Sequence, residues 1–174
     1  MADEKIINFD DPRDLLSYAY ALELEAGERY EDLADIMDTH NNDEVAGLFR
    51  KLSNIEGKHA QQIKAMLVEQ GFELPSIEYQ WEMPEGPETT PLDQLHYMMT
   101  PYHTLTLALH NEQRAFDYFS ALATKSSNEE VRGMALEMAE EEREHVQWVK
   151  EWLVKYPEPE AGWDEDMDPP VVQD

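Results

Sequence analysis

Two short stretches decide the fold: NIEGKHAQQI at residues 54–63 and EEEREHVQWV at residues 140–149. Each contains a glutamate followed three residues later by a histidine. Residues three apart lie on the same face of an α-helix. In both stretches that face is otherwise apolar, so each Glu–His pair interrupts the side of a predicted helix that should be buried.

The surrounding sequence predicts four long helices, because apolar residues recur with a helical period. The predicted helices run from Pro12 to about Met37, from Asn42 or Asp43 to about Gln70, from Pro101 to about Lys125, and from Ser127 to about Tyr156. Ser127 with Glu130 predicts a capping box at the start of the fourth helix. A short additional helical piece is expected over residues 91–99.

The connections between the helices predict the topology. The first and last pairs are joined by a few residues, so each pair should be antiparallel. Residues 71–91 contain four prolines and no periodic pattern. Fully extended, about 20 residues reach about 66 Å, which exceeds the roughly 42 Å length of the second helix. We therefore expect an all-α four-helix bundle with one long crossover between helices 2 and 3.

Six polar residues lie within the apolar stripes and form an internal repeat. They are Glu23, Glu56, His59, Glu112, Glu142 and His145. A shift of 89 residues places Glu23 on Glu112, and a shift of 86 places the first Glu–His pair on the second. Two helix pairs related in this way would bring both halves of one site to the centre of the bundle.

Four buried carboxylates need positive charge nearby. Without positive charge, burying each ionised carboxylate would cost several kcal/mol, or the carboxylate would take up a proton. No lysine or arginine falls in the stripes beside them. Two divalent cations would balance four carboxylates, and carboxylate with imidazole suits iron or manganese better than zinc. The sequence thus predicts a site for two iron ions, with manganese or mixed occupancy as alternatives.

The spacing of these residues resembles that of the ferritin-like superfamily, and most closely of rubrerythrin-like proteins. The matching pattern is Glu23-x-x-Ala26-x-x-x-Tyr30, Glu56-x-x-His59, Glu112-x-x-Ala115-x-x-x-Phe119 and Glu142-x-x-His145. The resemblance implies a ferritin-like fold. It also implies that Glu56 and Glu142 bridge two metals, that Glu23 and Glu112 are terminal ligands, that His59 and His145 each bind one metal, and that Tyr30 lies beside the site as a catalytic residue.

Two features differ from the family pattern. Rubrerythrins proper carry a rubredoxin domain with a four-cysteine iron site, whereas this sequence contains no cysteine. We therefore expect no built-in electron relay and an external electron donor. Rubrerythrins also often have a glutamate three residues after the ligand on the third helix, where this chain has Ala115.

Composition excludes several classes of function. The chain of 174 residues has 39 acidic and 13 basic residues, a net charge of −26. Such a surface repels phosphate backbones and anionic lipids, so we expect neither nucleic acid nor membrane as a partner. No apolar stretch is long enough for a membrane span, and the acidic start does not resemble a signal peptide. A cytoplasmic location is expected.

Three functions remain open. The first is a di-iron carboxylate oxidoreductase acting on dioxygen or peroxide, as a rubrerythrin-like peroxide reductase or a ferroxidase. The second is iron binding and storage of the ferritin type, and the third is a metal-free helical adaptor. Residues 1–156 should form the bundle and residues 157–174 an acidic, proline-rich tail, docked at most through Trp163. Apolar side chains expected on the surface favour a homodimer; these are Met98, Met99, Tyr102 and Trp148.

Overall fold

The structure is a computed structural model that describes residues 10–75 and 96–165. These two ranges contain four helices and no strand, which confirms the all-α prediction. The helices are α1 (Pro12–Thr39), α2 (Asp43–Glu69), α3 (Pro101–Lys125) and α4 (Glu129–Leu153). Among the described residues, none of the helices combines the length and apolar character that a membrane span requires.

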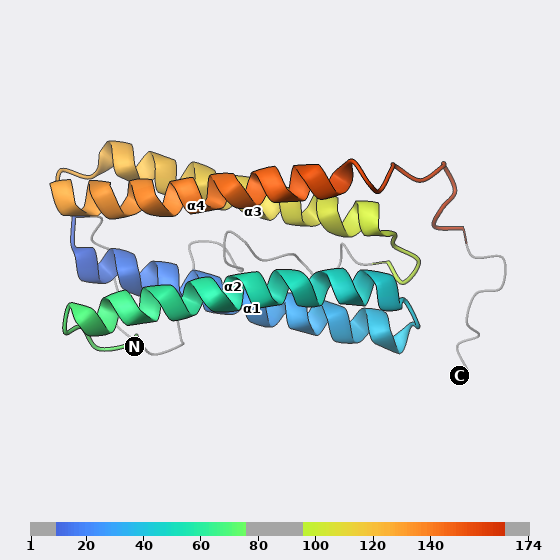
Figure 1. Ribbon diagram of the computed structural model, residues 1–174, viewed down its shortest axis with the longest axis horizontal. Helices are drawn as coiled ribbons and strands as arrows, with labels where there is room; N and C mark the ends of the chain where they lie inside the picture. The colour runs from blue at the N-terminus through green and yellow to red at the C-terminus, as the bar shows by residue number, and fades with distance from the viewer. Residues whose placement is uncertain (1–9, 76–95, 166–174) are drawn as a thin grey trace, which may run out of the picture.

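The helices form two antiparallel pairs, α1 with α2 and α3 with α4 (Figure 1). Packing is extensive within each pair and sparser between the pairs. In Figure 1, α2 ends at the left end of the bundle and α3 begins at the right end, so these two helices run parallel. The chain between them must therefore connect opposite ends of the bundle. The predicted four-helix bundle with one long crossover is confirmed.

Local sequence signals define most helix ends. The Asp11 side chain accepts a hydrogen bond from the Arg13 N–H, and Pro12 occupies the first turn of α1, where no N–H is needed. Asn42 caps α2 by accepting from the Val45 N–H. Gly71 follows α2 with φ of +73°, a left-handed conformation that glycine adopts without strain.

The predicted capping box at Ser127 is wrong, because Asn128 is the N-cap of α4. Ser127 lies outside the helix, where its N–H and its hydroxyl both donate to the carboxylate of Asp10. The Ser126 hydroxyl donates to the same carboxylate. Asp10 thus joins the start of α1 to the turn between α3 and α4, a long-range contact that local sequence does not reveal.

The segment before α3 also differs from the sequence prediction. Residues 96–99 form a turn rather than a helix, while residues 91–95 of the predicted helical piece lie outside the described residues. The Asn42 side-chain amide donates to the Met99 carbonyl at 2.7 Å. This anchor turns the Met99 side chain into the core, where it is only 3% exposed. The expectation that Met99 lies on the surface is therefore wrong.

The apolar core has two parts, one toward each end of the bundle. One cluster includes Tyr30, Phe49 and Leu105, and the other includes Leu16 and Phe119. Along every helix, the six polar residues of the internal repeat lie between the residues of the two clusters. The core therefore encloses the polar middle of the bundle from both ends.

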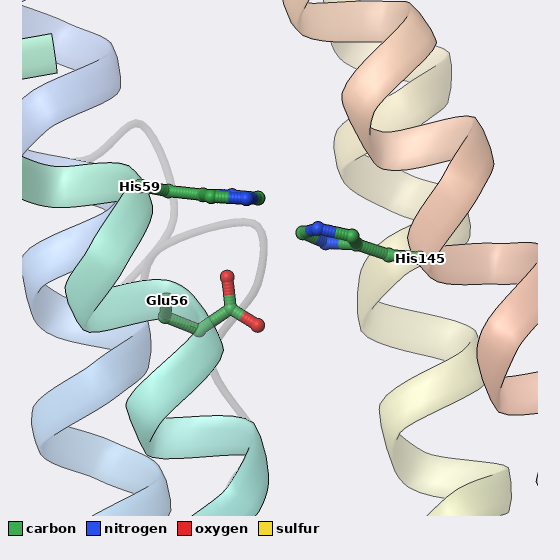
Figure 2. A group of neighbouring side chains, drawn as sticks. All are labelled: Glu56, His59 and His145. Atoms are coloured by element: carbon green, nitrogen blue, oxygen red, sulfur yellow. The ribbon is translucent and has the colours of Figure 1, made fainter. Parts of the chain in front are cut away.

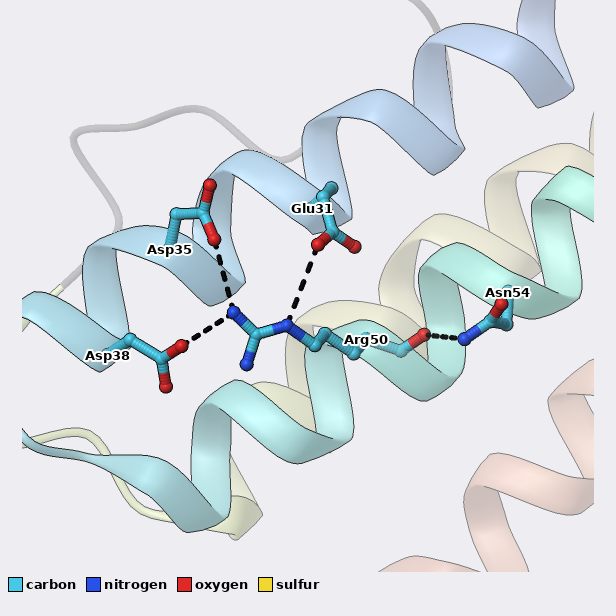
Figure 3. Close-up of polar contacts among 5 residues, drawn as sticks. All are labelled: Glu31, Asp35, Asp38, Arg50 and Asn54. Carbon is cyan, nitrogen blue, oxygen red and sulfur yellow. Dashed lines mark hydrogen bonds and ion pairs between the residues drawn. The ribbon is translucent and has the colours of Figure 1, made fainter.

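Charged residues on the outside pair mainly within a helix pair. Arg50 of α2 forms ion pairs with Glu31, Asp35 and Asp38 of α1, at 3.5, 3.1 and 2.5 Å (Figure 3). The hydrogen bond that Arg50 donates to the Asp38 carboxylate raises the pKa of the guanidinium. Because these side chains are largely exposed, each pair adds little stability. The fold depends mainly on its buried interior.

The start of the acidic tail packs against the end of the bundle. The Trp163 ring lies 3.8 Å from the His103 ring and 5.3 Å from the His96 ring, measured between ring centroids. His103 itself is held by the Thr100 N–H, which donates to its Nδ1 at 3.1 Å. Trp163 is therefore the contact through which residues 157–165 dock.

The Asp10 contact gives a testable prediction. The hydrogen bonds from Ser126 and Ser127 lower the pKa of Asp10 below its ordinary value of 3.8. A lowered carboxyl pKa stabilises the fold above the ordinary pKa, and this contribution is lost as the pH falls. Asp10→Ala should therefore lower the melting temperature at pH 7, and the difference from wild type should shrink below about pH 4.

Thermal unfolding followed by circular dichroism measures this effect. Asp32→Ala, at an exposed position on α1, is the matched control and should melt like the wild type. An Asp10→Ala melting temperature equal to that of the control at pH 7 would contradict the structural role of Asp10.

Candidate metal centre

The structure brings all six residues of the internal repeat together in the middle of the bundle. Each helix contributes: Glu23 from α1, Glu56 and His59 from α2, Glu112 from α3, and Glu142 and His145 from α4. The four glutamates and His145 are each at most 3% exposed. His59 is half-buried. A group of four carboxylates and two imidazoles is therefore almost fully removed from solvent.

The imidazole nitrogens face the carboxylates. His145 Nδ1 lies 3.0 Å from Glu112 Oε2 and 3.4 Å from Glu142 Oε2. His59 Nδ1 lies 3.8 Å from Glu23 Oε1. Each histidine thus directs one ring nitrogen at the carboxylate of the helix that packs against its own, although only the His145 contact is short enough for a hydrogen bond.

The two histidines meet across the bundle. Figure 2 shows His59 on α2 and His145 on α4 pointing toward one another, with Glu56 directed into the same space from the preceding turn of α2. The two ring centroids are 4.4 Å apart and the rings are nearly parallel, at 17°. The side chains of both helix pairs therefore converge on one small volume.

Three groups of ligand atoms within this volume could hold a metal ion, since all atoms of a group lie within 4.8 Å of one another. The groups are Glu23–His59–Glu142, Glu112–Glu142–His145 and Glu56–His59–His145. The first two divide the site between the halves of the repeat and share Glu142. The third combines Glu56 with both histidines.

The unmet hydrogen-bonding capacity of the site also fits a metal. Glu56 Oε1 and His59 Nδ1 are buried and have no hydrogen-bond partner. A buried polar atom without a partner costs about 1–3 kcal/mol, and more when charged. Two ligand atoms each about 2.1 Å from one ion and about 90° apart are about 3.0 Å from each other. The 3.0 Å distance between His145 and Glu112, which is a hydrogen bond in the metal-free protein, equals this spacing, and the 3.4 Å distance to Glu142 is slightly longer.

Burial and mutual repulsion shift the carboxylate pKa values upward. Removal from water raises the pKa of Glu56 well above 4.5, and the nearby Glu112 carboxylate raises it further. Burial likewise raises the pKa of Glu142, although the hydrogen bond from His145 opposes the shift. Without metal, the site therefore retains protons that ordinary glutamates release.

The two histidines shift in opposite directions. Burial lowers the pKa of His59 to about 4, and a charged His145 contributes to the shift. Burial also acts to lower the pKa of His145, but its hydrogen bonds to Glu112 and Glu142 outweigh this effect and raise the pKa to about 11. In the metal-free protein, His145 therefore keeps its proton to a higher pH than His59 does.

Small side chains next to Glu23 and Glu112 allow the helices to pack closely around the site. Ala26 lies three residues after Glu23 and Ala115 three residues after Glu112, and both alanines are at most 1% exposed. Residues three apart share a helix face. Larger side chains at these two positions would compete with the carboxylates for the same interior space.

Tyr30, predicted to lie beside the site, is buried at 2% exposure in the cluster that flanks it. The Asn111 side-chain amide donates to the Tyr30 hydroxyl at 3.2 Å. Asn111 directly precedes Glu112 on α3. The sequence prediction did not include Asn111, although a buried asparagine next to a predicted ligand was an available signal.

Trp148 also contacts the site. Its ring stacks on the His145 ring, with centroids 5.3 Å apart and an angle of 25°. Sequence reasoning assigned Trp148 only to the surface, and the side chain is indeed 43% exposed. The spacing of three residues from His145 was the signal for the additional contact.

The bundle, its long crossover and its central carboxylate–histidine cluster define a ferritin-like protein. The rubrerythrin family model matches residues 14–90 and 103–168, so the chain belongs to the rubrerythrin family. The predicted resemblance is thereby confirmed.

A solved structure supports the same fold. The crystal structure of an uncharacterized conserved protein from Magnetospirillum magnetotacticum MS-1 is similar, with a TM-score of 0.65 and 37% sequence identity. The match covers 86% of this chain and 98% of the other. No curated protein matches the sequence.

The pKa shifts predict how pH affects the metal-free protein. Glu56 and His145 both have raised pKa values in the folded state, so their stabilising contributions are lost as the pH rises. His59 has the opposite effect, but only between about pH 4 and its ordinary value of 6.5. Above pH 6.5, the free energy of unfolding in the presence of chelator should therefore fall as the pH rises.

Denaturant unfolding in chelator from pH 6.5 to 9 measures this slope. Glu56→Gln removes one raised carboxyl and should make the decline shallower, whereas Glu28→Gln, at an exposed position on α1, should leave it unchanged. A stability that is constant or rises over this range would contradict the assigned protonation of the site.

Proposed function

We propose that this protein is a di-iron carboxylate oxidoreductase that acts on dioxygen or peroxide with electrons from an external donor. One observation carries the proposal: four carboxylates and two imidazoles converge in a buried volume where ligand atoms lack hydrogen-bond partners. A protein interior holds such a group only with compensating charge or protons. Membership of the rubrerythrin family favours two iron ions as that charge.

We assign the ligands according to the groups in the site. Glu23 with His59 would hold one iron, and Glu112 with His145 the other. Glu142 would bridge them, which its presence in both groups supports. Glu56 would be the second bridge, because it lies with the histidines of both halves.

When bound, the iron ions would supply the electrons and the Lewis acidity that reduction of an O–O bond requires. The protein residues supply the rest. The two apolar clusters exclude bulk water from the ends of the site. Asn111 holds the Tyr30 Oη, from which a proton could be delivered toward the site. Tyr30 is thus the proposed catalytic side chain.

The electron donor is proposed to be a separate molecule, because the sequence contains no cysteine and hence no four-cysteine iron site. We further propose a cytoplasmic protein that binds neither nucleic acid nor membrane, in keeping with its net charge of −26. A homodimer is also proposed. Its support is the apolar surface that Met98 and Tyr102 leave partly exposed, whereas the buried Met99 gives none.

The ligand assignment predicts metal content. Glu56→Ala should remove a shared ligand and reduce the content from two irons per chain to near zero, whereas His59→Ala should weaken mainly one position. Elemental analysis after anaerobic reconstitution with Fe(II) measures both, and Glu28→Ala serves as an exposed control. Two irons retained in Glu56→Ala would contradict the bridging role. A wild type that binds no metal would instead favour the adaptor.

The reaction is tested by mixing the reduced di-iron protein with dioxygen or hydrogen peroxide in a stopped-flow instrument. We expect rapid oxidation of two irons per chain and re-reduction by an added donor. Tyr30→Phe should keep both irons but slow oxidation, by up to the 10²–10⁴-fold typical of a lost proton donor. Growth of a ferric mineral under excess Fe(II), without turnover of peroxide, would favour iron storage instead.

A further inference from the structure

A small hollow lies against the metal-binding groups, between α2 and α4. Its volume is about 10 Å³, which is room for about one water-sized molecule. It is lined by Leu52, Ile55, Glu56, Glu112, His145, Trp148, Val149 and Trp152. Nearly all of its exposed lining is apolar.

The lining of the hollow includes both residues of the site and partly exposed residues. Its inner wall contains Glu56, Glu112 and His145, each at most 3% exposed. Its outer wall contains Trp148, which is 43% exposed, and Trp152, which is half-buried. The lining therefore runs from the two partly exposed tryptophans to the carboxylate and imidazole side chains of the site.

The chemistry of the walls restricts what can pass. An ion that leaves water for an apolar passage loses several kcal/mol of hydration, and this outer wall offers no charged group in return. A neutral molecule with two heavy atoms loses far less. The hollow has room for about one water, so a molecule with two heavy atoms needs only a small movement of a wall side chain, whereas a bulkier one needs a much larger movement.

We infer that this hollow is the entrance for a small neutral oxidant, with Trp148 and Trp152 as the walls that set the size limit. This inference rests on the proposed function, since it identifies the oxidant as dioxygen or hydrogen peroxide rather than a bulky organic hydroperoxide. Trp148 is well placed for this role because its ring is held against His145.

A second groove between the same two helices provides a contrast. It is lined by Gln62, Ile63, Met66, Met134, Glu137, Met138 and Glu141. Its exposed lining contains a much larger polar share than that of the hollow. Met134 therefore offers a matched control, because its truncation enlarges a neighbouring groove without altering the tryptophan walls.

The entrance can be tested in the metal-free protein by NMR. Dissolved dioxygen is paramagnetic and speeds the relaxation of nearby methyl protons. The methyl groups of Leu52, Ile55 and Val149 should show a several-fold larger enhancement than those of Leu16 and Leu33, which are 0% exposed in the closed core. Equal enhancements in the two sets would overturn the inference.

The size limit is tested with the iron-loaded protein and oxidants of two sizes. Trp148→Ala should speed oxidation by tert-butyl hydroperoxide several-fold relative to hydrogen peroxide, whereas Met134→Ala should leave the ratio unchanged. Ile55→Phe should slow both oxidants by narrowing the entrance. An unchanged ratio in Trp148→Ala, with iron content equal to that of the wild type, would overturn the role of Trp148.

These outcomes separate the entrance from the proposed function. Dioxygen that enriches at the Leu52 and Ile55 methyls of a protein whose iron does not react would support the entrance and contradict the oxidoreductase. Rapid oxidation without such enrichment would support the oxidoreductase and contradict the entrance.

Discussion

The repulsion among four carboxylates in a nearly dry volume is the constraint on which the rest of the structure depends. Removal from water disfavours the ionised form of Glu56, and repulsion from the nearby Glu112 carboxylate disfavours it further. The bundle can close only if protons, a charged His145 or metal ions offset this charge. A metal ion held by ligand atoms of both helix pairs, as in the group Glu23–His59–Glu142, would couple the docking of the pairs to the chemistry of the site.

This coupling explains how the core is organised. A single apolar cluster would leave no place for the six polar groups, whereas two clusters enclose them from both ends. Packing is extensive within each helix pair and sparser between pairs, so the central site spans the weaker interface. A metal bound there would connect the pairs directly and add its binding free energy to that of folding.

The surface regions on the two sides of the site differ in polarity. Toward one end of the bundle, Trp148 and Trp152 line the mostly apolar hollow, while toward the other end Glu137 and Glu141 line a more polar groove. Buried Tyr30 and Asn111 supply a hydroxyl held at a fixed position within the core. The carboxylate and imidazole side chains come from all four helices, whereas the hollow lies between α2 and α4 and the Tyr30–Asn111 contact joins α1 to α3.

The sequence by itself determined the four helices, their topology and the six polar residues, because each depends on local periodicity, spacing or connection length. The duplicated Glu–His pairs indicated the site, since a charged side chain within an apolar stripe needs a compensating charge or a proton when it is buried. Only the tertiary structure decided that Asp10 binds the turn before α4, that Met99 is buried, and that Asn111 contacts Tyr30. These contacts join residues distant in the chain, and their partners become known only when the helix pairs are packed together.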